Sequence, residues 1–417
     1  IDKVSDEPLL AKKPKPSPLK KRTENKEIGY TELTFENGTK VICKPTDFKN
    51  DEILFAAYSP GGHSIYDYET FLSANYCSDI ITQSGAGQFD VTALKKKLAG
   101  ATVELKPWVS TLLEGIDGNC APKDFETLLK LNYLYFTEPR KDSIAFQTFL
   151  SQMENRTKFI KSNPMYAFRD TLIKTITQND PRSIILPDKQ QLDKIELNAA
   201  YKTYRDRFAD AGDFLFFLVG NFDIEEAIPL LETYIGGLPS IDRNESWKNV
   251  EPEFPDGITN VTIHKGTEPK SEVAIAMKNS FEWNEVNMLH LNMAIKILSI
   301  KLRESMREDQ GGVYGVWVND DTQKFPEPKY SIFVSFGCSP ENVDTLTNTV
   351  FREMKQLTDE GPEALDLTKA KETLIRQREL NVKKNAFWMM RLKGIYYTDN
   401  EVLSVENYKK RVNGVTE

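Results

Sequence analysis

The sequence repeats a short pattern at an offset of 218 residues, and this repeat limits the folds that the chain can adopt. The segment Cys120–Pro122 recurs as Cys338–Pro340, and Glu126–Leu128 recurs as Asp344–Leu346. The apolar positions also correspond, and they are Phe125, Leu128, Tyr133 and Phe136 in the first copy and Val343, Leu346, Phe351 and Met354 in the second. Their spacing places them on one helical face, so the repeat predicts the same amphipathic helix twice.

Each predicted helix follows a strand-like run, residues 111–116 in the first copy and 330–336 in the second. Two strand–turn–helix units at a domain-sized separation predict two similar modules. Chance similarity between two short amphipathic helices is the alternative. We favour the modules because the Cys-x-Pro turn and the apolar positions agree in the same register.

The composition is that of a globular protein. Hydrophobic residues make up 40% of the 417 residues and charged residues 28%, and the length suggests two or three domains. A net charge of −8 argues against a nucleic-acid partner. No apolar run approaches the roughly 20 residues of a membrane-spanning helix, so we expect no membrane span in this chain. The chain begins at Ile1–Lys3 without a signal-peptide core, which predicts a processed or excised segment.

Residues that could bind a metal are few. The three histidines are far apart in the sequence: His63, His264 and His290. The four cysteines form no Cys-x-x-Cys pair and are too sparse for a disulfide framework: Cys43, Cys77, Cys120 and Cys338. A zinc hydrolase usually brings two or three histidines to its metal. We therefore expect no zinc and no other cofactor in this chain, and we expect the cysteines to be free thiols.

The order of turn signals and periodic runs predicts an α+β fold of two homologous modules, each a mostly antiparallel sheet covered by helices. Residues 1–27 are rich in Lys and Pro, which predicts a solvated linker or tether. A basic patch for nucleic acid is the less favoured interpretation of this segment. The first module is expected over 28–238, a second linker over 239–258, and the second module over 259–417, C-terminally truncated.

Individual elements have signals of different strength. Asn37-Gly38 between two strand-like runs predicts a β-hairpin. The continuously apolar run 214–219 predicts a strand buried on both faces. In the second module, we expect strands, including one at 260–264, and a helix over 283–308. No counterpart of the 214–219 strand follows before the chain ends, so we expect the native chain to continue and the second sheet to be one strand short.

The strongest motif is Arg307–Gly315, in which an Arg at a helix end is followed by acidic residues, two glycines and then Tyr314 at a strand start. This motif resembles the pitrilysin/insulinase-type zinc metallopeptidases. The segments 59–62 (Ser-Pro-Gly-Gly) and 218–223 (Leu-Val-Gly-Asn-Phe-Asp) also look like the family's repeated module. Together these motifs extend the resemblance over nearly everything from residue 28 onward.

The sequence departs from the family at its metal site. Active members carry H-x-x-E-H on the helix expected here at 68–82, with two His ligands and a Glu general base. This chain has Asn-Tyr-Cys-Ser-Asp-Ile over 75–80 instead. Glu154 lies near the position of the family's third ligand, but one carboxylate cannot hold zinc, so we expect Glu154 to be a solvated helix residue. The resemblance is therefore to the family's degenerate modules.

The resemblance implies a function for the whole chain. It implies the non-catalytic half of a zinc metallopeptidase, which encloses peptide substrates and positions them for a catalytic half that holds the zinc. That partner would be part of the same protein or a paired subunit. The alternatives are a stand-alone non-catalytic subunit, like those of mitochondrial processing peptidase, and a peptide-binding scaffold. The family resemblance also suggests the bacterial periplasm or cell envelope.

Arg307 and Tyr314 are the candidate substrate-binding residues, and we expect no catalytic residue in this chain. The guanidinium offers fixed donors for peptide carbonyl or carboxylate groups. The hydroxyl of Tyr314 can donate to an oxyanion that develops on a metal-bound carbonyl. The alternative is structural, with Arg307 paired to Glu304 or Glu308 and Tyr314 in the core.

Overall fold

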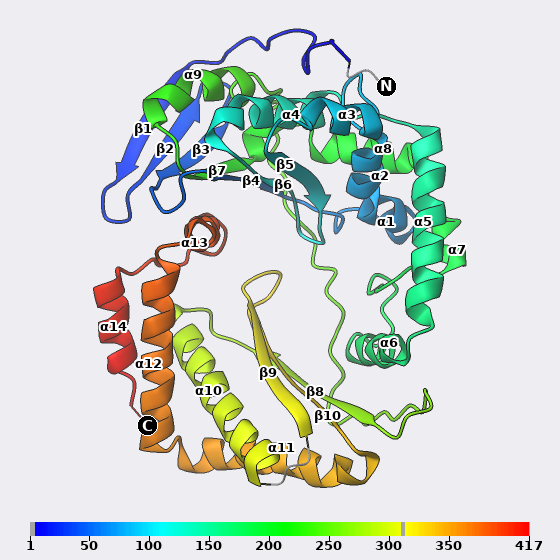
Figure 1. Ribbon diagram of the computed structural model, residues 1–417, viewed down its shortest axis with the longest axis vertical. Coiled ribbons are helices and arrows are strands. Elements are labelled where there is room, and N and C mark those ends of the chain that lie inside the picture. Colours follow the sequence, from blue (N-terminus) through cyan, green and yellow to red (C-terminus); the bar gives the residue numbers. More distant parts are fainter. Residues whose placement is uncertain (1–4, 310–312, 417) are drawn as a thin grey trace. The chain divides into compact units, whose positions relative to one another are not determined.

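A computed structural model describes residues 5–309 and 313–416 (Figure 1). The chain divides into two compact units. Unit 1 comprises Ile1–Phe159, Leu186–Val250 and Lys383–Gly394, and unit 2 comprises Ile160–Ile185, Glu251–Val382 and Ile395–Glu417. Two segments, 160–185 and 383–394, thus belong to a different unit from their neighbours in the sequence. The module boundaries given above as 28–238 and 259–417 remain a prediction.

Unit 1 is built on a seven-stranded sheet with the order β1-β2-β3-β7-β4-β6-β5. Its strands are β1 (Leu19–Asn25), β2 (Tyr30–Phe35), β3 (Lys40–Pro45), β4 (Ile53–Pro60), β5 (Val103–Val109), β6 (Leu113–Cys120) and β7 (Leu215–Gly220). Strands β3 and β7 run parallel, and the other neighbouring pairs run antiparallel. The expected fold class, mostly antiparallel sheets with helices, is confirmed.

The helices of unit 1 are α1 (Tyr68–Asn75), α2 (Cys77–Ser84), α3 (Val91–Leu98), α4 (Phe125–Thr137), α5 (Ser143–Lys161, ending in unit 2), α7 (Lys189–Leu192), α8 (Leu197–Arg207) and α9 (Ile224–Tyr234). Helix α4 contacts β5, β6 and α9, and α8 contacts α1 and α2. Figure 1 shows α4 and α9 over one face of the sheet and the start of α13 (Asn385–Thr398) against the other.

Strand β7 lies at the centre of this core. Every residue from Phe216 to Gly220 is buried, which confirms the prediction from its continuous apolar run. The hairpin at Asn37-Gly38 is confirmed too, because β2 and β3 pair on either side of it. Gly38 has φ +91°, a left-handed conformation that favours glycine.

The segment before the first hairpin is more ordered than a solvated linker. Strand β1 pairs along its length with β2, and the N–H of Ser17 donates to the carbonyl oxygen of Glu232 on α9. The five central side chains of β1 are exposed. Backbone hydrogen bonds to β2 hold this strand in place. The Lys-rich composition of the segment does not indicate these bonds. The linker prediction for 1–27 was therefore wrong for residues 19–25.

The start of α13 is anchored in unit 1. The side chain of Asn385 contacts Thr46 at 2.5 Å and donates to Glu52 at 3.0 Å. Farther along the helix, Lys393 forms an ion pair with Asp117 on β6 at 3.1 Å. The ammonium of Lys44 on β3 also lies 4.2 Å from the centre of the Trp388 ring, a cation–π distance. A segment near the C-terminal end of the sequence therefore completes the packing of unit 1.

Unit 2 contains a three-stranded antiparallel sheet with the order β8-β10-β9. Its elements are α6 (Pro164–Ile176), β8 (Ser271–Ser280), α10 (Glu285–Arg303), a π-helical turn (Glu304–Asp309), β9 (Val313–Gln323), β10 (Lys329–Cys338), α11 (Val343–Glu360), α12 (Ala364–Asn381), the end of α13 and α14 (Val405–Asn413). The strand expected at 260–264 was wrong, because this exposed segment has no regular structure.

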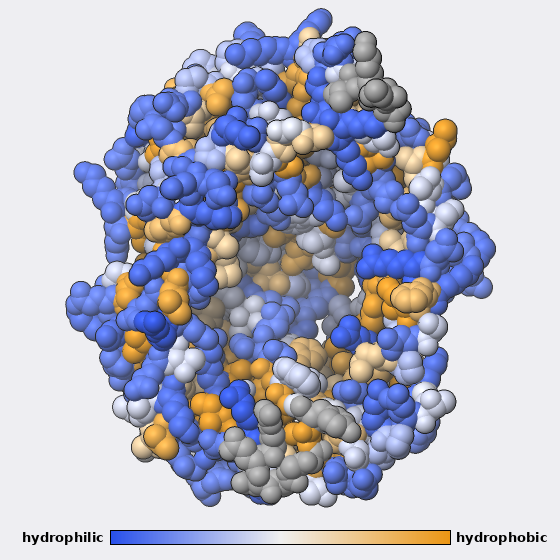
Figure 2. Space-filling view, in the orientation of Figure 1, coloured by the Kyte–Doolittle hydropathy of each residue, from blue (hydrophilic) through white to orange (hydrophobic). Residues whose placement is uncertain are grey.

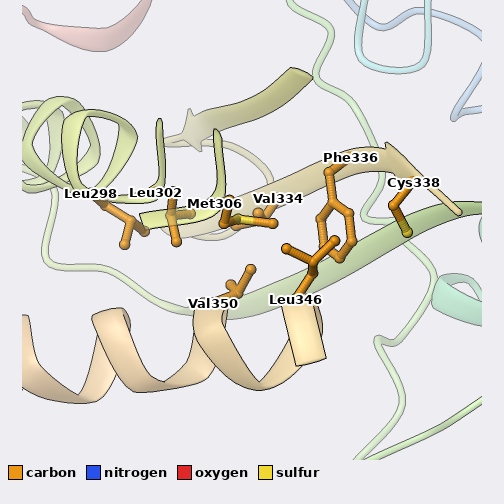
Figure 3. Packing of buried hydrophobic residues seen from close by; sticks show 8 residues of the cluster. All are labelled: Leu298, Leu302, Met306, Val334, Phe336, Cys338, Leu346 and Val350. Carbon is orange, nitrogen blue, oxygen red and sulfur yellow. The ribbon is translucent and has the colours of Figure 1, made fainter. Parts of the chain in front are cut away.

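The core of unit 2 is visible in Figure 3, where eight buried side chains from α10, the π-helical turn, β10 and α11 meet. They are Leu298, Leu302, Met306, Val334, Phe336, Cys338, Leu346 and Val350. Apolar residues on alternate positions of β8 and β9 pack against the same cluster. One face of the three-stranded sheet is thus packed on the helices, as alternation along a strand predicts.

The surface is mostly polar, and Figure 2 shows hydrophilic side chains over much of the face in view. Within the described residues, no helix combines the length and the apolar character needed to cross a membrane.

The internal repeat is confirmed at the level of local structure. Strand β6 leads through the 3₁₀ turn Pro122–Asp124 into α4, and β10 leads through the 3₁₀ turn Pro340–Asn342 into α11. The cysteine that ends each strand is buried in both copies. We expect the whole modules to superpose as well, with α4 and α11 in equivalent places.

Candidate substrate-binding segment and degenerate metal position

The segment with the candidate residues Arg307 and Tyr314 connects α10 to β9. Arg307 belongs to the π-helical turn Glu304–Asp309, and Tyr314 is the second residue of β9. The side chains of both residues lie outside the described part of the structure, so their substrate-binding roles remain predictions. Gly311 and Gly312 also lie outside the described residues. The single helix expected over 283–308 ends as an α-helix at Arg303 and widens into the turn.

The helix expected at 68–82 is two short helices that meet at Tyr76. This residue ends α1 and begins α2, and its backbone has φ −103° and ψ 3°, outside the α-helical range. The Tyr76 ring contacts Phe149 on α5 at a centroid distance of 5.9 Å. The break therefore lies within the segment that corresponds to the H-x-x-E-H motif of active family members.

The side chains at the degenerate motif are either buried in the core or exposed to solvent. Cys77 and Ile80 are fully buried, and Asp79 forms an exposed ion pair with Lys106 at 3.1 Å. Burial raises the pKa of Cys77 to about 12, which keeps the thiol protonated at neutral pH. Glu154, on α5, pairs with Lys158 at 2.7 Å on the helix surface, in agreement with a solvated helix position.

The three histidines are not gathered at a site. His63 is buried, and its ring lies edge-on to Phe71 at 5.0 Å, whereas His264 and His290 are exposed. No group of three or more His, Cys, Asp or Glu residues that could hold a metal ion occurs in the described ranges 5–309 and 313–416. The residues present therefore do not fit a zinc ion.

The sequence analysis missed a buried ion cluster around Arg207, the last residue of α8. Its guanidinium is 1% exposed and forms ion pairs with Asp206 at 2.9 Å and Glu245 at 2.6 Å. The carboxylate of Glu114, fully buried on β6, lies 3.7 Å away. Charged groups are rarely buried unless they are paired. No sequence signal joins these residues, because they come from three separate segments.

The Pro60-Gly61-Gly62 turn is shaped by this cluster. The N–H of Gly62 donates to the carboxylate of Glu114 at 2.6 Å. A Cβ on Gly61 would lie 2.4 Å from Arg207, and both glycines have positive φ, +144° and +60°. Glycine is therefore needed at both positions for close approach and for backbone conformation.

The second predicted linker, 239–258, is held to unit 1 over its first half. The carboxylate of Asp210 accepts hydrogen bonds from the backbone N–H groups of Ile241 and Arg243. The guanidinium of Arg243 contacts Asp213 at 3.2 Å and donates to the carbonyl oxygen of Asp206 at 2.8 Å. This part of the linker has no regular secondary structure, but charged hydrogen bonds fix it in place.

Glu114 should make stability depend on pH. Burial raises its pKa to about 8 from 4.5, although the charge of Arg207 and the Gly62 N–H lower it. Because the folded state binds this proton more tightly, the contribution of Glu114 is present below pH 4.5 and is lost as the pH rises through 8. We expect Glu114→Gln to reduce the pH dependence of the free energy of unfolding, measured with urea, between pH 4.5 and 8. An unchanged slope would contradict the prediction.

Comparison with known proteins identifies the region that contains the candidate segment. Residues 194–374 match the family model of the peptidase M16 inactive domain. Over these residues the chain is similar to M16 inactive domains. The resemblance to the non-catalytic half of insulinase-type zinc peptidases is therefore confirmed.

Similar proteins are named as zinc proteases. The Arabidopsis thaliana "Zinc protease PQQL-like" is 24% identical over 403 residues, which cover 93% of this chain and 39% of the relative. The Haemophilus influenzae "Probable zinc protease PqqL" is 25% identical over 321 residues, covering 76% and 34%. The chain thus spans well under half the length of these curated relatives.

Solved structures show the same M16 fold. The periplasmic protease PqqL from Escherichia coli matches with a TM-score of 0.81 and 18% identity, over 97% of this chain and 46% of that one. The peptidase M16 inactive domain from Pseudomonas fluorescens matches with a TM-score of 0.71 and 16% identity, over 93% and 92%.

We expect this chain, purified without chelators, to contain no stoichiometric zinc. The physical reason is that residues 75–80 contain no histidine and the Cys77 thiol is buried. The carboxylates of Asp79 and Glu154 are engaged with Lys106 and Lys158. Elemental analysis of the folded chain checks this. One tightly held zinc per chain would contradict it.

Proposed function

We propose that this chain is the non-catalytic half of a zinc metallopeptidase that encloses peptide substrates and positions them for a separate catalytic half. The observation that supports it most is the match of residues 194–374 to an M16 inactive domain, in a chain whose 75–80 segment has lost both histidines. A module with this fold and no metal ligands can still contribute surface and hydrogen-bond donors to a shared site.

In this proposal, Arg307 and Tyr314 carry the substrate contacts. The motif places one residue in the turn after α10 and the other at the start of β9, where the connection is short. Arg307 would hold a carbonyl or carboxylate of the peptide, and Tyr314 would donate to the oxyanion at the metal of the other half. The zinc belongs to that half, and the residues described above do not bind it.

The catalytic half would be in the same polypeptide or in a paired subunit. The curated relatives are more than twice as long as this chain, which supports a single polypeptide. The Escherichia coli neighbour is described as periplasmic, which supports a periplasmic or cell-envelope location. An H-x-x-E-H motif upstream in the same reading frame would decide for one polypeptide, and a separate gene would decide for a subunit.

Reconstitution tests the proposal. An unfolded fluorogenic peptide would be offered to this chain, to the catalytic half and to both together, with zinc bound to the catalytic half. We expect cleavage only when both are present, because substrate must be held from both sides. A catalytic half that cleaves equally fast alone would overturn the proposal and leave a scaffold role for this chain.

Tyr314→Phe should lower turnover in the complete enzyme by about 10- to 150-fold, the value of one hydrogen bond to a charged oxygen, roughly 1.5–3 kcal/mol. The change keeps the aromatic ring, so KM and zinc content should stay close to those of the wild type. Steady-state kinetics check this, with Tyr330→Phe on β10 as the matched control. If Tyr314→Phe affects KM alone, its hydroxyl does not meet the oxyanion.

A further inference from the structure

The π-helical turn Glu304–Asp309 is an unusual way to end a helix. In π-helical geometry the backbone bonds from i to i+5, and such turns are rare and often occur at functional sites. The turn inserts extra length between α10 and β9, and it contains Arg307. In a regular α-helix each residue is rotated by about 100° from the last, so a change in winding shifts every later backbone position in the turn.

Three consecutive residues fix the start of this turn. Glu304 accepts from Lys369 on α12 at 3.4 Å, in a pair that is about 40% exposed on each side. Ser305, 9% exposed, donates its hydroxyl to Glu353 on α11 at 2.8 Å. Met306 is fully buried in the core cluster of Figure 3. Of the two polar contacts, the one made by Ser305 is the shorter and the more buried.

Glu353 is an unexpected residue at its position. Leu346, Val350 and Glu353 recur at the spacing of one helical face, and the first two belong to the apolar core cluster. The Glu353 side chain is 10% exposed, and it also forms an ion pair with the neighbouring Arg352 at 2.9 Å. A carboxylate on an apolar face costs desolvation unless it is hydrogen-bonded.

The internal repeat supplies a comparison within the same chain. At the offset of 218 residues, the equivalent of Glu353 is Tyr135 on α4, which is also buried. The strand–turn–helix unit therefore forms without an acid at this position. What the second copy has in addition is the π-helical turn, whose Ser305 contacts the acid.

We infer that the buried hydrogen bond from Ser305 to Glu353 holds the winding of the π-helical turn to which Arg307 belongs, so that Ser305 and Glu353 are positioning residues for the proposed substrate site. This inference rests on the proposed function. Without the hydroxyl, the turn loses its polar attachment to α11 and can relax toward regular α-helical winding, which would redirect Arg307.

Amide hydrogen exchange on the full chain tests the attachment itself. We expect Ser305→Ala to speed exchange across 304–309 by about 10-fold or more, because local opening of the turn becomes easier. The control Val412→Ala removes methyl groups from the other buried cluster of unit 2. It should not speed amide exchange at 304–309 more than in the rest of the chain. Equal exchange in both variants would overturn the inference.

A double-mutant cycle in the complete enzyme tests the action through Arg307. Ser305→Ala should lower kcat/KM by roughly 3- to 10-fold, mainly through KM, and should add almost nothing in the Arg307→Ala background. Ser305→Thr keeps the hydroxyl and Glu353→Gln keeps an acceptor, so both should retain most of the activity.

The outcomes separate the two ideas. Equal losses from Ser305→Ala in both backgrounds, or no loss at all while Arg307→Ala is impaired, would overturn the inference and leave the proposed function standing. No loss from Arg307→Ala would overturn the proposed function, and hydrogen exchange would then show only whether the turn depends on Ser305.

Discussion

Arg207→Ala is expected to lower the free energy of unfolding by about 3–5 kcal/mol, because it removes one partner from a buried ion cluster. Glu114, which lies 3.7 Å from the guanidinium, and Glu245, at 2.6 Å, would lose their main positive partner. The arginine is almost wholly buried, so water cannot replace it without opening the turn at Gly61. Urea denaturation followed by circular dichroism measures the effect.

Arg205→Ala is the matched control, because Arg205 lies on the same helix and is exposed. It should change stability by less than about 0.5 kcal/mol. The double variant Arg207→Met/Glu114→Gln should recover part of the loss, since it replaces the buried guanidinium with apolar volume and the carboxyl group beside it with an amide that cannot ionise. A loss from Arg207→Ala no larger than from Arg205→Ala would show that the cluster contributes little.

Arg307→Ala in the complete enzyme is expected to lower kcat/KM by about 10- to 150-fold. The loss corresponds to one charge-assisted hydrogen bond to substrate, worth roughly 1.5–3 kcal/mol. Zinc content of the catalytic half and the unfolding temperature should not change if Arg307 acts only on substrate. Steady-state kinetics with a peptide substrate check the prediction.

Arg303→Ala is the control for this change, since Arg303 is an exposed arginine one helical turn earlier at the end of α10. It removes the same charge at nearly the same place in the sequence. If both variants lose activity equally, a general electrostatic effect explains the result. Near wild-type kinetics for Arg307→Ala, with the fold intact, would assign the residue a structural role.

Local signals in the sequence predicted local structure well. The Asn37-Gly38 hairpin, the apolar strand β7 and the repeated Cys-x-Pro turn all follow from residues close together in the chain. Each depends on backbone preference or on periodic burial, and a few neighbouring residues are enough to indicate either one.

Features that depend on distant partners could not be predicted in this way. Strand β1 is held by pairing with β2, not by apolar side chains, so its lysines suggested a linker. The buried charge of Arg207 is compensated by residues as far apart in sequence as Glu114 and Glu245. The π-helical turn after Arg303 is likewise fixed by α11 and α12, and a periodic helix pattern does not show where the winding changes.

The anchoring of 383–394 in unit 1 has a consequence for biosynthesis. A ribosome that has translated the seven strands of unit 1 has not yet made Asn385 or Lys393, which contact Glu52 and Asp117. Unit 1 therefore emerges with one part of its sheet surface uncovered and is completed only after most of unit 2 has been synthesised. The two units therefore cannot complete their folding one after the other in the order of translation.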